Sequence, residues 1–146
     1  MNTLRRLMCL LLCLCLAGGN ALAEAKLDPE REAFMLERAE TLLRFIREGD
    51  EEAALLMMDD TMRNALAGQI GIMWPQLAAL GGEILGTGAA QSLSQDGFDI
   101  VLLELRFKNL TLIQRAVFDA QGKVAGLVFA PGSVTAQTPE QNVEEE

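Results

Sequence analysis

Histidine and tyrosine are absent from this chain of 146 residues, and only three cysteines occur, all within the first 15 residues. Histidine is the usual general base near neutral pH, so its absence excludes the catalytic triads that depend on it. Basic residues are also few, with 12 Lys and Arg against 21 Asp and Glu. Because nucleic-acid binding requires Lys and Arg to neutralise phosphates, this balance argues against a nucleic-acid partner.

The first 23 residues have the parts of an export signal. Arg5 and Arg6 precede an apolar run over residues 7–17, and Ala21-Leu22-Ala23 forms a small-residue cleavage site. The run has 11 residues, whereas a membrane-spanning helix needs about 20. We therefore expect a secreted protein that leaves by the general secretory route, is cleaved after Ala23 and keeps no stable membrane anchor. A retained anchor, lipid attachment at Cys15 and twin-arginine export are the weaker alternatives.

Cleavage would leave a chain with no cysteine, because Cys9, Cys13 and Cys15 all lie in the signal. Disulfides and zinc-thiolate sites are then excluded, and no metal or cofactor is expected. The 123 remaining residues carry 10 basic and 21 acidic side chains, a formal charge of −11. We expect one domain over residues 24–132 and an acidic, disordered tail over residues 133–146.

Helical spacing fills the first half of this domain. Asp28 is suited to cap a helix that begins at Pro29 and ends at Gly49. Asp50 predicts the start of a second, short helix through residues 53–58. A third helix is expected from Asp60 or Thr61 to about residue 80, with a kink at Pro75. Its apolar positions recur at steps of three or four and are Met62, Leu66, Ile70, Met73, Leu77 and Leu80.

Strand signals follow after Gly82. We expect strands over residues 83–93, 98–108, 112–119 and 124–130, separated by turns that contain Gly97 and Gly122. The strand over residues 98–108 alternates most clearly. Three helices followed by a hairpin-connected meander predict an α+β fold, with the helices packed on a curved, four-stranded antiparallel sheet.

Four features stand in order between residues 30 and 131, and they are Glu48-Gly49-Asp50, Asp59-Asp60-Thr61-Met62, the Trp74 helix running into Gly81-Gly82-Glu83-Ile84, and residues 118–127 (FDAQGKVAGL). In this order they resemble domain-of-unknown-function family 3887, within the nuclear transport factor 2-like superfamily. That family is a secreted bacterial group whose domain also occurs fused ahead of α/β-hydrolase domains. The resemblance implies a cone-shaped fold with a pocket between helices and sheet, and it brings no catalytic residues.

Few residues are available for chemistry in such a pocket. The isomerase-like members of the superfamily use an acidic base with an oxyanion hole partly built from tyrosine, which this chain lacks. Asp99 and Glu104 would serve as a base if buried, but the alternation of their strand favours solvated outer positions. The acid pairs at residues 51–52 and 59–60 lack calcium-loop spacing, and they suit the first turns of helices. We assign no catalytic residue and no metal ligand.

Met73 and Trp74 are the predicted ligand-binding residues. Trp74 stands before Pro75, where a pocket mouth would form, although large aromatic residues more often serve packing. A homodimer is also expected, because Phe98, Ile100 and Leu102 are apolar on the strand face opposite Val101.

Together these features predict a secreted, non-catalytic binding module. Its partner would be a small apolar ligand or an envelope protein. Among envelope proteins, a hydrolase is one class of partner, which the module would serve as an accessory protein. The alternative function is a histidine-free lyase or isomerase that uses a buried carboxylate. A carboxylate with a raised pKa inside the pocket would favour the enzyme, and an apolar lining would favour the binding module.

Overall fold

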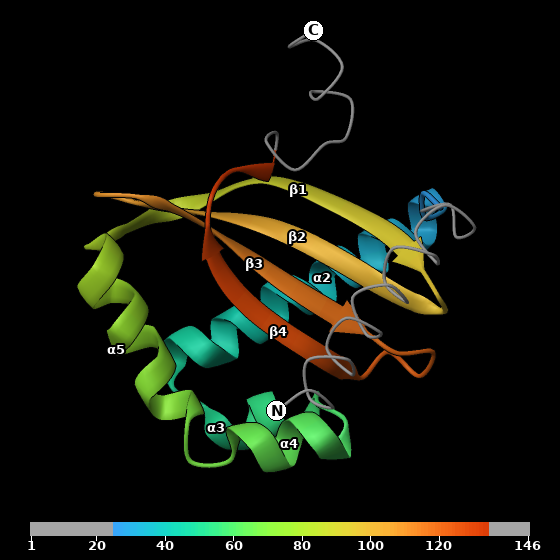
Figure 1. Ribbon diagram of the computed structural model, residues 1–146, viewed down its shortest axis with the longest axis horizontal. Coiled ribbons are helices and arrows are strands. Elements are labelled where there is room, and N and C mark those ends of the chain that lie inside the picture. Colours follow the sequence, from blue (N-terminus) through green and yellow to red (C-terminus); the bar gives the residue numbers. More distant parts are fainter. Residues whose placement is uncertain (1–24, 135–146) are drawn as a thin grey trace, which may run out of the picture.

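The computed structural model describes residues 25–134. The predicted export signal with its cysteines, and residues 135–146 of the predicted tail, lie outside this range. Four helices precede four strands, with the bounds α2 (Pro29–Glu48), α3 (Glu51–Leu56), α4 (Asp60–Leu66), α5 (Ile70–Gly81), β1 (Ile84–Gln95), β2 (Phe98–Phe107), β3 (Thr111–Phe118) and β4 (Val124–Pro131) (Figure 1). The predicted α+β class is confirmed. Within the described range, no helix has both the length and the apolar character that crossing a membrane requires.

Helix α2 forms where the sequence predicts it. The Asp28 carboxylate accepts a hydrogen bond of 3.0 Å from the Arg31 backbone N–H, and Pro29 occupies the first turn. Gly49 ends the helix with φ of 71°, a left-handed conformation that glycine adopts without steric cost. The buried side chains of α2 are Met35, Ala39, Leu42, Leu43 and Ile46, which form one face.

The predicted third helix is wrong in one respect, because the structure divides it into two. Helix α4 ends at Leu66 and α5 begins at Ile70, so the described residues contain four helices rather than three. Gly68 lies between them with φ of 80°, which an α-helix does not accommodate, and its N–H donates to the Glu51 carboxylate. The apolar spacing runs unchanged across this break and therefore conceals it. Pro75 consequently lies inside α5 instead of in the last turns of a long helix.

The sheet is an antiparallel meander in the order β1-β2-β3-β4. Leu103 of β2 pairs with Gln114 of β3, and Gln114 pairs with Phe129 of β4. Strand β1 has register shifts between Ile84 and Gly86 and between Thr87 and Ala90, and glycines in a strand commonly accompany such irregularities. Figure 1 shows α2 crossing one face of the sheet, while α5 leads to the start of β1.

The core lies between α2 and the sheet face that it covers. Val101, Leu103 and Leu105 of β2 are at most 1% exposed and pack in two clusters with side chains of α2, β3 and the turn after α3. One polar side chain, that of Gln114, is fully buried among them, and its Nε2 donates a 3.0 Å hydrogen bond to the Ala39 carbonyl. This bond ties the middle of α2 to β3.

The opposite face of the sheet is the one on which the predicted homodimer depends. Phe98 is 40% exposed there, whereas Ile100 is buried and Leu102 half-buried. The homodimer stays a prediction, and sedimentation of the protein at micromolar concentration tests it.

Candidate functional site

Met73 and Trp74 lie on α5, where both are half-buried against the core. The Trp74 ring lies 5.6 Å from the Phe107 ring between centroids, and the Arg47 guanidinium lies 5.7 Å above the Trp74 centroid. These contacts pack α5 against β2 and α2. Neither residue lines the two pockets described below, so their ligand-binding role stays a prediction.

Asp99 is buried, contrary to the expected solvated position. Odd-numbered residues of β2 face the helices, and Asp99 belongs to the same series as Val101 and Leu103, with 6% of its surface exposed. Arg31 of α2 compensates the buried charge, because its Nε donates a 2.8 Å hydrogen bond to Oδ2 of Asp99. The carboxylate is thus engaged by a guanidinium.

Glu104 is also buried, at 5% exposed, and the expectation of a solvated position is again wrong. Its residue parity places it on the face away from α2, where Arg106 Nε donates to Oε1 at 2.9 Å and the Val134 backbone N–H donates to Oε2 at 3.2 Å. These hydrogen bonds, that from Arg106 first, lower the pKa of Glu104. Glu104 therefore stays ionised near neutral pH.

The lowered pKa makes the contribution of Glu104 to stability dependent on pH. Because the pKa is lower in the folded state, the ionised carboxylate stabilises the protein above the ordinary value of 4.5, and this stabilisation is lost as the pH falls through the folded-state pKa. We expect Glu104→Gln to be less stable than the wild type at pH 7, with the difference shrinking below about pH 4.5. Urea unfolding at pH 7, 5 and 3.5 measures it. Glu83→Gln, at an exposed position, is the control. A stability difference between Glu104→Gln and the wild type that stayed the same from pH 7 to pH 3.5 would contradict the lowered pKa of Glu104.

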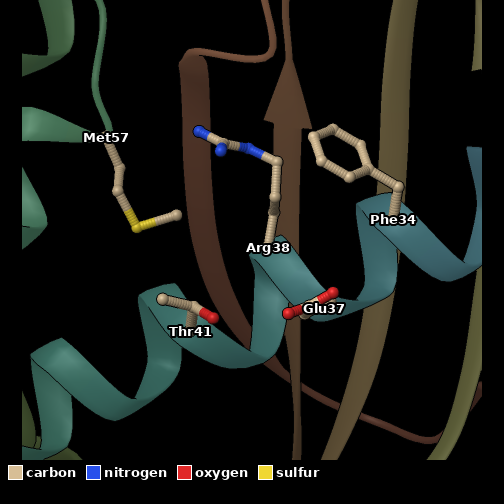
Figure 2. Close-up of a pocket in the computed structure, with 5 residues that line it drawn as sticks. All are labelled: Phe34, Glu37, Arg38, Thr41 and Met57. Carbon is tan, nitrogen blue, oxygen red and sulfur yellow. The ribbon is translucent and has the colours of Figure 1, made fainter.

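A pocket of about 180 Å³ lies beside α2, and we call it the Arg38 pocket. Its lining residues are Phe34, Glu37, Arg38, Thr41 and Met57 (Figure 2). The first four come from successive turns of α2, since positions three and four apart share a helix face. Met57 follows α3 and forms the opposite wall. Figure 2 shows the Arg38 side chain rising from the helix between the Phe34 ring and Met57.

Arg38 is held by aromatic rings rather than by carboxylates. Its guanidinium carbon lies 5.8 Å from the Phe34 ring centroid and 5.9 Å from that of Phe118, which is fully buried. Both distances lie within the range of cation–π attraction. The Nε atom is buried and has no hydrogen-bond partner. Among residues 25–134, the arginines that form ion pairs are Arg31, Arg63 and Arg106.

A second hollow, of about 380 Å³, lies between the start of α2 and β1. Lys26, Glu32, Gln91 and Ser92 are among its lining residues, and the buried Ser92 hydroxyl has no hydrogen-bond partner. Like the Arg38 pocket, this hollow was not predicted from the sequence.

The acids considered for calcium have local roles instead: Asp59 caps α4 by accepting a 2.8 Å hydrogen bond from the Met62 N–H. Within the described part of the chain, no cluster of three or more acidic side chains is placed to hold a metal ion.

The chain matches no family model, no curated protein and no solved structure. Function has to be inferred from the residues that surround the pockets. The Arg38 pocket was missed because its walls come from α2 and from the turn after α3, and because Phe118, whose ring supports Arg38, lies far away in the sequence at the end of β3. One local signal was present, since Phe34 and Arg38 stand four residues apart on a helix face, where an arginine stacks on an aromatic ring.

Proposed function

We propose that this protein is an exported, non-catalytic binding module with the cone fold of the nuclear transport factor 2-like superfamily. The meander that follows the helices and the resemblance to domain-of-unknown-function family 3887 support the fold, and the signal-like first 23 residues support export. The Arg38 pocket is the proposed binding site. An envelope hydrolase is a proposed partner class, by analogy with the fused domains of that family.

We favour binding over catalysis because both buried carboxylates, those of Asp99 and Glu104, are paired with arginines. An acidic residue that acts as a base needs a pKa raised toward the working pH and an open path to the substrate. Asp99 is instead engaged by Arg31, and Glu104 is engaged by Arg106 with a lowered pKa. These contacts favour a binding module over the alternative lyase or isomerase.

Nuclear magnetic resonance of the purified protein with a mixture of small aromatic and aliphatic compounds tests this proposal. We expect some compounds to shift the resonances of Thr41 and Met57 saturably and to be recovered unchanged. Glu104→Gln, which alters a carboxylate outside the pocket, should bind the same compounds. Conversion of a compound, lost on Glu104→Gln or Asp99→Asn, would support the enzyme instead, and the absence of any binding would refute the module.

A further inference from the structure

We propose that the Arg38 pocket binds a small carboxylic acid with a compact apolar or aromatic body, an inference that rests on the proposed binding function. The guanidinium of Arg38 would take the carboxylate, and the Phe34 and Met57 side chains would contact the apolar body. The predicted ligand was apolar only. A fixed cation in the pocket wall makes an anionic group the better fit.

The position of the guanidinium is fixed before any ligand arrives. Phe34 and Phe118 both lie within 6 Å of it, and Gly122 in the turn between β3 and β4 is close enough that a Cβ there would lie 3.6 Å from Nε. In Figure 2 the terminal nitrogens point into the space toward Met57. A guanidinium presents planar, paired donors that match the two oxygens of a carboxylate, and a preorganised side chain loses little entropy on binding.

The absence of an internal counterion is what points to an anion. The chain has 21 acidic residues, and the two buried carboxylates described above, those of Asp99 and Glu104, each pair with an arginine. Arg38 forms no ion pair within the described residues, although Glu37 precedes it in the chain and also lines the pocket. Arg44 and Arg47 of the same helix are exposed to water, whereas Arg38 is half-buried and its Nε is fully covered. Desolvation of a cation is offset when an opposite charge or dipole contacts it.

The walls and the volume set the size and character of the ligand. A volume of about 180 Å³ is below the roughly 300–1,000 Å³ of sites for drug-sized ligands, so the body has the size of a single ring or a short chain. Phe34 supplies a ring face, Met57 an adaptable thioether and Thr41 a hydroxyl for the second carboxylate oxygen. Inorganic phosphate would use the guanidinium but would leave the apolar walls uncovered.

Titration with benzoate, benzamide and inorganic phosphate distinguishes these features. The measurement is the nuclear magnetic resonance shift of the Arg38 Nε–H and the Met57 methyl group in the purified protein. We expect benzoate to bind saturably and about tenfold or more tightly than its neutral analogue benzamide, because hydrogen bonds to a charged group are worth about 1.5–3 kcal/mol. Phosphate should bind more weakly than benzoate.

Variants at two arginines of α2 locate the effect. Arg38→Gln should abolish the preference for benzoate over benzamide, and Arg38→Lys should retain part of it. Arg44→Gln is the matched control, because Arg44 also stacks on a phenylalanine, Phe45 at 5.3 Å, and lies outside the pocket. This control should bind benzoate like the wild type. Thermal unfolding shows whether Arg38→Gln folds. If it does not, the preference for benzoate over benzamide is compared between Arg38→Lys and the wild type, and a smaller preference in Arg38→Lys supports the site.

Each contrary result has a distinct meaning. Equal binding of benzoate and benzamide in the pocket would overturn the carboxylate inference and leave the binding module standing. If phosphate bound as tightly as benzoate, the inference that the ligand has an apolar body would be wrong. Equal loss of benzoate binding in Arg44→Gln and Arg38→Gln would show general charge attraction and refute the site. If no compound binds, both the carboxylate inference and the proposed function fail.

Discussion

Replacement of Phe118 by alanine is expected to lower the free energy of unfolding by about 3–5 kcal/mol, the usual range for a buried phenylalanine. The side chain is the largest of those that are fully buried, and it packs in the core cluster that joins α2 to the sheet. Its ring also supports the Arg38 guanidinium. Removing it leaves a cavity that β3 and α2 cannot both move to fill. Urea unfolding measures the loss.

Phe98→Ala is the control for this prediction. Phe98 is 40% exposed, so its truncation removes less buried surface and should cost much less. A loss for Phe118→Ala no larger than that for Phe98→Ala would show that the core is not centred on the contact between α2 and β3.

Gly81→Ala is expected to destabilise the protein by about 1–3 kcal/mol, the usual cost of overpacking. Alanine normally stabilises a helix relative to glycine, and Gly81 is the last residue of α5. Here a Cβ would lie 2.6 Å from Cγ and 2.7 Å from Cβ of Phe107, which is too close for any carbon contact. Phe107 is buried in a core cluster and its ring packs against Trp74, so moving it aside would disturb that packing.

Gly71→Ala, in the same helix, is the matched control and should have the opposite sign. A Cβ on Gly71 would meet no atom within 4 Å, so the substitution should stabilise the protein by about 0.4–1 kcal/mol by restricting the unfolded chain. Thermal unfolding of both variants checks the pair. Stabilisation by Gly81→Ala would show that α5 does not pack closely on Phe107.

Local signals predicted most of the fold. Asp28, Pro29 and Gly49 delimit α2 because caps act through neighbouring backbone groups. The β2 face that carries Val101, Leu103 and Leu105 is buried, but Ile100 and Glu104 on the other face are buried too, so burial along β2 does not alternate. The break at Gly68 was missed because apolar periodicity reports which face is buried, and that face continues from α4 to α5. A glycine within a helical pattern was the available signal.

The candidate site was less predictable, because its contacts join distant segments. Asp99 shares the parity of Val101, so its burial against the helices was deducible from the strand period. Its partner Arg31 lies 68 residues away, and no spacing in one sequence reveals that pair. The partner of Glu104 was nearer, since Arg106 stands two residues later on the same strand face. For Arg38, no local pattern reports that Phe118 and Met57 complete its surroundings.

The turn after α3 is fastened to the start of β4 by two backbone hydrogen bonds. The Val124 N–H donates to the Met57 carbonyl at 2.8 Å, and the Asp59 N–H donates to the Val124 carbonyl at 2.9 Å. An amide hydrogen exchanges with solvent only when its bond opens. The rate of deuterium uptake at the Val124 amide thus reports how often the segment that carries Met57 separates from β4. A ligand bound in the Arg38 pocket should slow that uptake.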